Sequence, residues 1–155
     1  MINVGLHMRC SRCGKCCENT EMELSEDDIR RLVEAGHKPE DFMVVYGGTP
    51  RLRNLNGWCY FYDLRKRQCK VYRLRPLGCR IYPVIYVEGE GFTLDGLCPM
   101  RHTVSEREFK AKARALKKLL AKIDGARLQQ RFIALAENGG VKGFIFSSPP
   151  PSMGF

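Results

Sequence analysis

The stretch Cys10-Ser11-Arg12-Cys13-Gly14-Lys15-Cys16-Cys17 contains four of the eight cysteines of this chain. The other four follow at wide intervals, at Cys59, Cys69, Cys79 and Cys98. Cysteines at three-residue steps can direct their sulfurs towards one metal ion or cluster, because the chain between them is tightly wrapped. Eight thiols suffice for two four-sulfur sites, the coordination that structural zinc and iron–sulfur clusters both use. The sequence therefore predicts metal binding, with all eight cysteines as candidate ligands.

Composition limits the class of protein. A chain of 155 residues predicts one domain with a modest core. No segment approaches about 18 uninterrupted apolar residues, so no membrane span is predicted. The N-terminus also lacks the basic stretch and apolar run of a secretory signal. We therefore expect a cytoplasmic protein, in which a reducing environment favours metal ligation over disulfide bonds.

The formal net charge of +9 is a weak indication of a nucleic-acid partner. Two filled four-thiolate zinc sites would change it by −8 + 4 = −4, to about +5. Much of the basic excess then balances the metal sites. A series of lysines and arginines between residues 110 and 122 could contact an acidic protein or a nucleic acid. Such a series is more often a solvated helix face.

The pattern between the cysteines predicts an α+β fold, with a small, loop-rich core of short β-hairpins, stapled by metal and surrounded by helices. Ser25 is a candidate N-cap for a helix that ends at Gly36. A second helical turn is expected at residues 39–42, broken by the Gly-Gly-Thr-Pro sequence at 47–50. Hairpins are expected from residues 58–62 with 68–72 and from 84–87 with 92–94.

The C-terminal third predicts helices. Ser105 and Glu108 form a capping box that opens a helix from residue 106 to about 124. Gly125 should interrupt it, and a second apolar pattern continues to residue 136. We expect one cysteine-cluster domain over residues 1–140, with its helical part at 105–139, and a proline-rich tail at 141–155.

Two templates compete for the first four cysteines. Cys10 and Cys13 match a zinc knuckle, in which two sulfurs straddle one ion. Cys10, Cys13 and Cys16 together match the bacterial ferredoxin spacing, in which a distant cysteine, often followed by proline as Cys98 is, completes a [4Fe–4S] cluster. The third cysteine is superfluous to a knuckle, which favours iron–sulfur slightly. Side chains of adjacent residues usually diverge, so Cys16 and Cys17 are expected to serve two sites or to bridge two neighbouring metals.

The combined motifs resemble the YkgJ-type cysteine-cluster family, whose signature is CxxCxxCC. The resemblance extends over roughly residues 8 to 100 and rests on the following segments: Cys10 to Cys17, Cys59 with Phe61 and Asp63, Cys69-Lys70-Val71-Tyr72, Arg75-Pro76 and Cys79-Arg80-Ile81-Tyr82-Pro83. It implies zinc or iron chelation and names no substrate. The same module occurs in enzymes that methylate flagellin lysines, for which an iron–sulfur cluster has been implicated.

Three functional hypotheses follow. The first is a metal-binding protein that holds iron–sulfur clusters or zinc through its eight cysteines, with Arg75 and Arg80 as candidate contacts to a cluster. An equal alternative for Arg75 is a turn that positions Cys79. The second hypothesis is an enzyme component that uses a cluster for electron or methyl-group transfer. The third is a structural-zinc module that binds nucleic acid.

Overall fold

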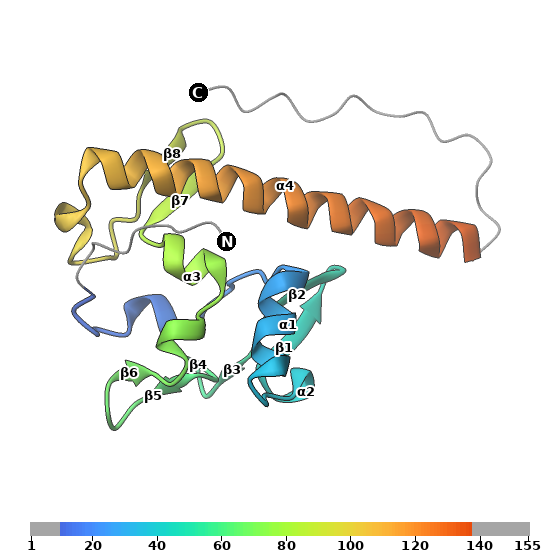
Figure 1. The fold of residues 1–155 in the computed structure, drawn as a ribbon, viewed down its shortest axis with the longest axis horizontal. Coiled ribbons are helices and arrows are strands. Elements are labelled where there is room, and N and C mark those ends of the chain that lie inside the picture. Colours follow the sequence, from blue (N-terminus) through green and yellow to red (C-terminus); the bar gives the residue numbers. More distant parts are fainter. Residues whose placement is uncertain (1–9, 138–155) are drawn as a thin grey trace.

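The computed structural model describes residues 10–137 and shows the α+β fold that the sequence predicts. One long helix lies across an assembly of short helices and two-stranded antiparallel sheets (Figure 1). The helices are α1 (Glu26–Glu34), α2 (Pro39–Phe42), α3 (Leu77–Ile81) and α4 (Glu106–Glu137), with 3₁₀ turns η1 (Lys15–Cys17), η2 (Tyr72–Leu74) and η3 (Arg101–Thr103). The paired strands are β1 (Met43–Tyr46) with β2 (Thr49–Leu52), β3 (Asn54–Leu55) with β4 (Trp58–Cys59), β5 (Tyr62–Asp63) with β6 (Gln68–Cys69), and β7 (Val84–Val87) with β8 (Gly91–Leu94). Within the described range no helix is long and apolar enough to cross a membrane.

Helix α1 begins at the predicted N-cap and also fixes the start of α3. Ser25 Oγ accepts the backbone N–H of Asp28, and Asp28 Oδ2 accepts the backbone N–H of Ser25, which completes a capping box. Asp28 is fully buried, and its Oδ1 accepts from Arg31 Nη2 at 2.8 Å and from the backbone N–H of Leu77 at 2.9 Å. One carboxylate therefore satisfies the first N–H groups of two helices.

The segment after α2 differs from the prediction. The sequence predicts only a break at residues 47–50, whereas the structure shows a hairpin in which Tyr46 pairs with Thr49. Gly47 and Gly48 form its two-residue turn, with φ of 58° and 78°. Both angles lie in the left-handed region that a tight hairpin turn requires, which explains the Gly-Gly pair.

The predicted hairpin of residues 58–62 with 68–72 is also corrected. Strand β4 pairs with β3, the strand that precedes it in the sequence, through an Asn56-Gly57 turn with φ of 51° and 82°. Only the shorter β5 pairs with β6, joining Tyr62 to Cys69. Asn-Gly is the strongest local signal for a two-residue hairpin, and it outweighs the continuous aromatic run that suggested one longer strand.

The predicted second hairpin is present as β7 and β8, but the predicted helix break at Gly125 is wrong. Helix α4 continues through Gly125 to Glu137. Gly125 is exposed, with open space around it, and glycine costs an exposed helix only about 1 kcal/mol relative to alanine. The side chains of residues 128–137 and the tail at 141–155 lie outside the described part of the chain, so the predicted domain boundary remains a prediction.

Two clusters of buried side chains form the core. The first gathers around α1, α2 and the short hairpins, and its largest fully buried side chains are Phe42, Phe61 and Leu32. The second joins α3 and β7 to α4, with Ile81 and Ala113 fully buried. The described part of the protein therefore has two small hydrophobic clusters and not a single large core.

A buried ion pair anchors α4 to this second cluster. Lys112 Nζ lies 3.0 Å from Glu108 Oε1, and the two side chains are 1% and 3% exposed. Lys112 Nζ also donates to the backbone carbonyl of Tyr82 at 3.5 Å, at the end of α3. Lysine is almost never fully buried unless it is paired, so this contact holds α4 in one position.

Replacing Lys112 should therefore be far more damaging than replacing an exposed lysine of the same helix. We expect Lys112→Ala to lower the free energy of unfolding by about 3–5 kcal/mol, because it removes one partner of a buried ion pair. Lys110→Ala is the control, since Lys110 pairs with Glu106 at the surface and such pairs contribute at most about 1 kcal/mol. Urea denaturation followed by circular dichroism measures both. Equal losses of unfolding free energy in the two variants would contradict the claim that the buried Lys112 ion pair anchors α4.

Candidate metal centre

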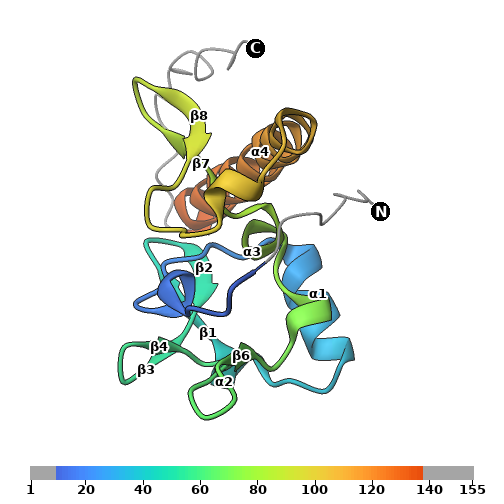
Figure 2. The same ribbon diagram turned by 90° about the vertical axis from the view of Figure 1, so that its left-hand side faces the viewer.

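The eight cysteines come from distant parts of the chain. Cys10 and Cys13 lie in the loop before η1, and Cys16 and Cys17 are part of η1 itself. The remaining four are carried by β4, β6, α3 and the segment before η3, in the order Cys59, Cys69, Cys79 and Cys98. The blue loop of residues 10–17 lies on the face of the molecule turned towards the viewer in Figure 2. All eight are free thiols.

The N-terminal cysteine loop rests on an aromatic platform. The Trp58 and Tyr62 rings stack with centroids 5.2 Å apart and an interplanar angle of 17°. Gly14, with φ of 78°, packs so closely on them that a Cβ atom would lie 2.6 Å from Tyr62 Oη. Tyr62 Oη also donates to the backbone carbonyl of Arg12 at 3.4 Å. A glycine is therefore required at residue 14 for both its backbone conformation and its lack of a side chain.

The Cys10 thiol accepts a hydrogen bond from the backbone N–H of Arg12, two residues further along the chain. Burial raises the pKa of Cys59, Cys69 and Cys98, and the backbone N–H groups at the same spacing, those of Phe61, Val71 and Met100, oppose the rise. The Arg12 nitrogen lies 3.4 Å from the Cys10 sulfur. A hydrogen bond to a sulfur stabilises its charged form, and the thiolate is the form that binds metal.

Burial and mutual repulsion have the opposite effect on the thiols in the interior. Burial raises the pKa of Cys59 to about 11, although the backbone N–H groups of Phe61 and Tyr62 act to lower it. Burial also raises the pKa of Cys79 well above its ordinary value, and the neighbouring Cys59, Cys16 and Cys69 raise it further. Several thiolates gathered without a cation repel one another, so this cluster is electrostatically suited to a bound cation.

Cys16 and Cys17 lie closer together than the sequence suggests. Their sulfurs are 4.0 Å apart, whereas adjacent side chains are expected to diverge. The hydrogen bond from Cys17 lowers the pKa of Cys16 to about 7 and raises that of Cys17 strongly. The separation is compatible with the predicted alternative in which the two thiols bridge neighbouring metals.

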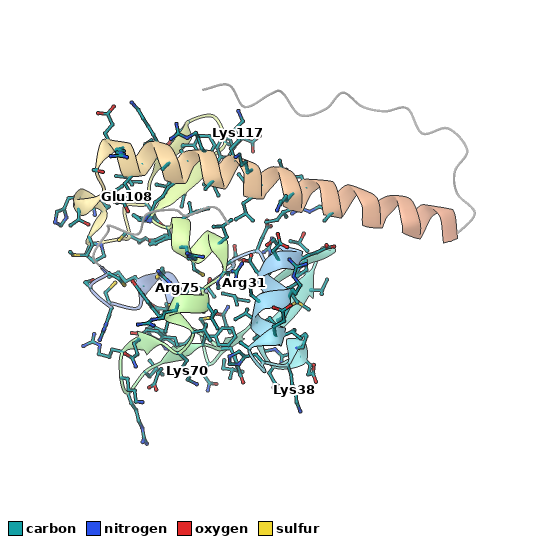
Figure 3. The ribbon with its side chains drawn as sticks, in the orientation of Figure 1. Arg31, Lys38, Lys70, Arg75, Glu108 and Lys117 are labelled. Atoms are coloured by element: carbon teal, nitrogen blue, oxygen red, sulfur yellow. The ribbon has the colours of Figure 1, made fainter. Side chains whose placement is uncertain are left out.

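Arg75 lies beside Arg31, the ion-pair partner of Asp28 (Figure 3). Its guanidinium carbon is 3.9 Å from the centre of the Tyr72 ring, and Arg31 Nη2 donates to its backbone carbonyl at 3.1 Å. Although burial raises the pKa of Cys69, the Arg75 cation opposes the rise, and it lowers the pKa of Cys16 as well. No hydrogen bond or ion pair of the Arg80 side chain is present among residues 10–137.

The basic series on α4 is less extensive than the sequence suggests. Lys112 is buried in the core, and Lys122 Nζ bridges to Asp27 Oδ2 at 3.1 Å. Lys110 pairs with Glu106. Lys112 is therefore unable to contact a partner, and Lys110 and Lys122 are already paired with acidic side chains at the surface.

Sequence reasoning missed the residues that position the cysteines. The sequence predicts Trp58 and Tyr62 only as part of a hairpin strand, and it gives Asp28 no role beyond the helix that Ser25 opens. Tyr82 Oη donates to Asp95 Oδ2 at 3.0 Å, beside Cys16 and Cys98. The Gly14 and Asn56-Gly57 positions were available as local signals for the tight loops, but their partners depend on tertiary packing.

The sulfurs are grouped but not drawn together to metal-binding distance. Among the described residues, no three His, Cys, Asp or Glu side chains converge closely enough to hold one metal ion. The fit to a metal rests on the donor chemistry instead: eight thiols and a set of N–H groups directed at them. The assignment of individual ligands therefore remains a proposal.

Comparison with known proteins identifies the family. Residues 9–115 match the CxxCxxCC family, described as "Putative zinc- or iron-chelating domain", so this chain belongs to that family. The uncharacterized protein MJ0661 of Methanocaldococcus jannaschii is 30% identical over 87 residues, which cover 51% of this chain and 46% of the relative. The chain thus spans about half the length of that relative. No solved structure matches the chain.

The seating of the cysteine loop can be tested at Gly14. We expect Gly14→Ala to reduce the metal content of the purified protein, because the new Cβ would meet the Tyr62 hydroxyl and push the loop away from the platform. Gly89→Ala is the matched control, since Gly89 has a similar φ of 84° and open space around it. Elemental analysis of both variants gives the result. Equal metal content in the two would show that the close contact does not position the site.

Proposed function

We propose that this protein binds metal through its eight cysteines, as two four-thiolate sites that hold iron–sulfur clusters or zinc. The observation that carries the proposal is the hydrogen bond from the Arg12 N–H to Cys10, together with the backbone N–H groups that favour the thiolate forms of Cys59, Cys69 and Cys98. These groups stabilise thiolates from four separate segments, which a purely structural cysteine would not need. The family description supports the same conclusion at the level of zinc or iron.

The thiol neighbours favour a particular division of ligands. Besides burial, the charges that raise the pKa of Cys98 are those of Cys13, Cys16 and Cys10. Those that raise the pKa of Cys17 include Cys59 and Cys79, and Cys69 acts on Cys79 in turn, while Cys16 acts on both groups. From the spacing of the first three cysteines and the charges at Cys98 we assign the N-terminal group as Cys10, Cys13, Cys16 and Cys98, and the interior group as Cys17, Cys59, Cys69 and Cys79. The 4.0 Å separation of Cys16 and Cys17 places the two groups next to each other.

Iron–sulfur is the preferred occupant of the N-terminal group. The spacing of Cys10, Cys13 and Cys16 with the distant Cys98-Pro99 fits a [4Fe–4S] cluster, which would supply one-electron chemistry when bound. Backbone N–H groups and the Arg75 cation would then offset the negative charge of its thiolates. The residues themselves bind the group, orient it and shield the interior side from water.

The identity of the metal is tested by anaerobic purification from iron-replete cells. We expect a brown protein with broad absorption near roughly 400 nm, where thiolate-to-iron charge transfer falls, and with iron and acid-labile sulfide. Colourless protein with stoichiometric zinc would contradict the iron–sulfur assignment and leave structural zinc in its place. Protein with neither metal would contradict metal binding itself.

The proposed role of Arg75 predicts a specific loss. We expect Arg75→Gln to weaken metal retention by about ten- to a hundredfold, the usual effect of removing a group that supports the ligands. Arg73→Gln is the control, because it makes the same charge change on an exposed side chain of the same 3₁₀ turn. Competition with a coloured chelator measures retention, and Arg80→Gln tests the second candidate in the same way. An equal effect of Arg73→Gln would reduce the role of Arg75 to general charge.

A further inference from the structure

The two thiol groups differ in how they are attached to the core. Cys59 is a member of the first core cluster, and Cys17, Cys69 and Cys79 pack against it. None of Cys10, Cys13, Cys16 and Cys98 belongs to either core cluster of the described residues. Packing alone thus separates the same two groups that the proposed function assigns.

We propose that the interior group is a structural site and that the N-terminal group is an exchangeable site, which takes up and releases its metal while the domain stays folded. This inference rests on the proposed function, because it assigns different roles to the two proposed sites. Two features of the structure carry it, namely the packing of the interior thiols against the core and the exposure of Cys10 and Cys16.

Packing couples the interior group to the fold. Its cysteines come from η1, two paired hairpin strands and α3, so an ion held there would join four elements of the first core cluster. Cys79 is further fixed because Asp28 accepts the N–H of Leu77 at the start of α3. Releasing an ion from this group requires these elements to separate, so its loss should unfold the domain.

Exposure sets two members of the N-terminal group apart. Cys10 and Cys16 are the two exposed thiols, whereas Cys98 is as buried as Cys59, at 7% exposed, and the other four are half-buried. Cys10, Cys13 and Cys16 sit on one short segment whose hydrogen bonds are mostly local, such as Arg12 N–H to Cys10 and Cys17 N–H to the Gly14 carbonyl. An incoming ligand can therefore reach the sulfurs of Cys10 and Cys16 from solvent while Gly14 stays seated on Tyr62.

Cys98 completes this group from the other side. Cys98 is buried, and the segment after it is held in place because Arg101 Nη1 donates to the carbonyls of Gly96 and Cys98 at 3.1 Å. One anchored and buried thiol with three on a surface loop would keep an ion in place while the loop opens. The arrangement suits uptake and release better than permanent storage.

The test uses cadmium, whose thiolate complexes absorb in the ultraviolet. Full-length protein is loaded with Cd²⁺ under reducing conditions and mixed with excess EDTA, while absorption and far-ultraviolet circular dichroism are recorded together. We expect half of the cadmium to leave in a fast phase with the dichroism unchanged. The other half should leave slowly, together with the loss of the hairpin and helix signal. Release in one phase, or loss of structure in the fast phase, would overturn the division.

Matched substitutions assign the two phases. Cys10→Ser should remove the fast half of the bound cadmium and leave the thermal midpoint unchanged. Cys69→Ser should remove the slow half and lower the midpoint. If Cys69→Ser fails to fold, the wild-type phases and Cys10→Ser still decide, because a lowered midpoint in Cys10→Ser contradicts the exchangeable role. Wild type that binds cadmium in one phase contradicts only the division, whereas wild type that binds none contradicts the proposed function.

Discussion

The close contact between Gly14 and Tyr62 is the constraint on which the cysteine cluster depends. The N-terminal loop has almost no regular structure of its own, and it reaches the hairpins only because residue 14 has no side chain. Two hydrogen bonds reinforce the contact. The Tyr62 hydroxyl donates to the Arg12 carbonyl, and the Asn19 N–H donates to the Gly57 carbonyl at 2.7 Å. The Asn-Gly turn that creates β4 therefore also receives the loop, so the hairpin and the cysteine cluster form together.

A second contact, at Asp28, brings the later cysteines to the same place. Its buried carboxylate joins the N-termini of α1 and α3, and its partner Arg31 holds the Arg75 carbonyl. A charge in this position is tolerated because Ser25, Arg31 and Leu77 all donate to it. The two core clusters are small, so the free energy of metal binding would add directly to the stability of the fold.

The sequence predicts local features well wherever one short signal decides them. The capping box at Ser25, the α2 turn and the β7–β8 hairpin were predictable for this reason, as was the family. Errors arise where two signals compete: Asn56-Gly57 outweighs the aromatic run after it, and a long amphipathic helix tolerates Gly125. The burial of Lys112 was not predictable, because its position in a series of lysines resembles a solvated face until the Glu108 contact is known. The cluster itself is visible in the spacing of the cysteines, but its division needs tertiary contacts.

X-ray absorption at the edge of the bound metal tests the central claim most directly, because it reports the ligand atoms whatever the metal is. The account predicts a first shell made of sulfur alone, at about 2.3 Å. For iron, a further iron shell from the cluster should accompany it. A first shell dominated by nitrogen or oxygen would contradict the claim that the cysteines of this chain are the ligands.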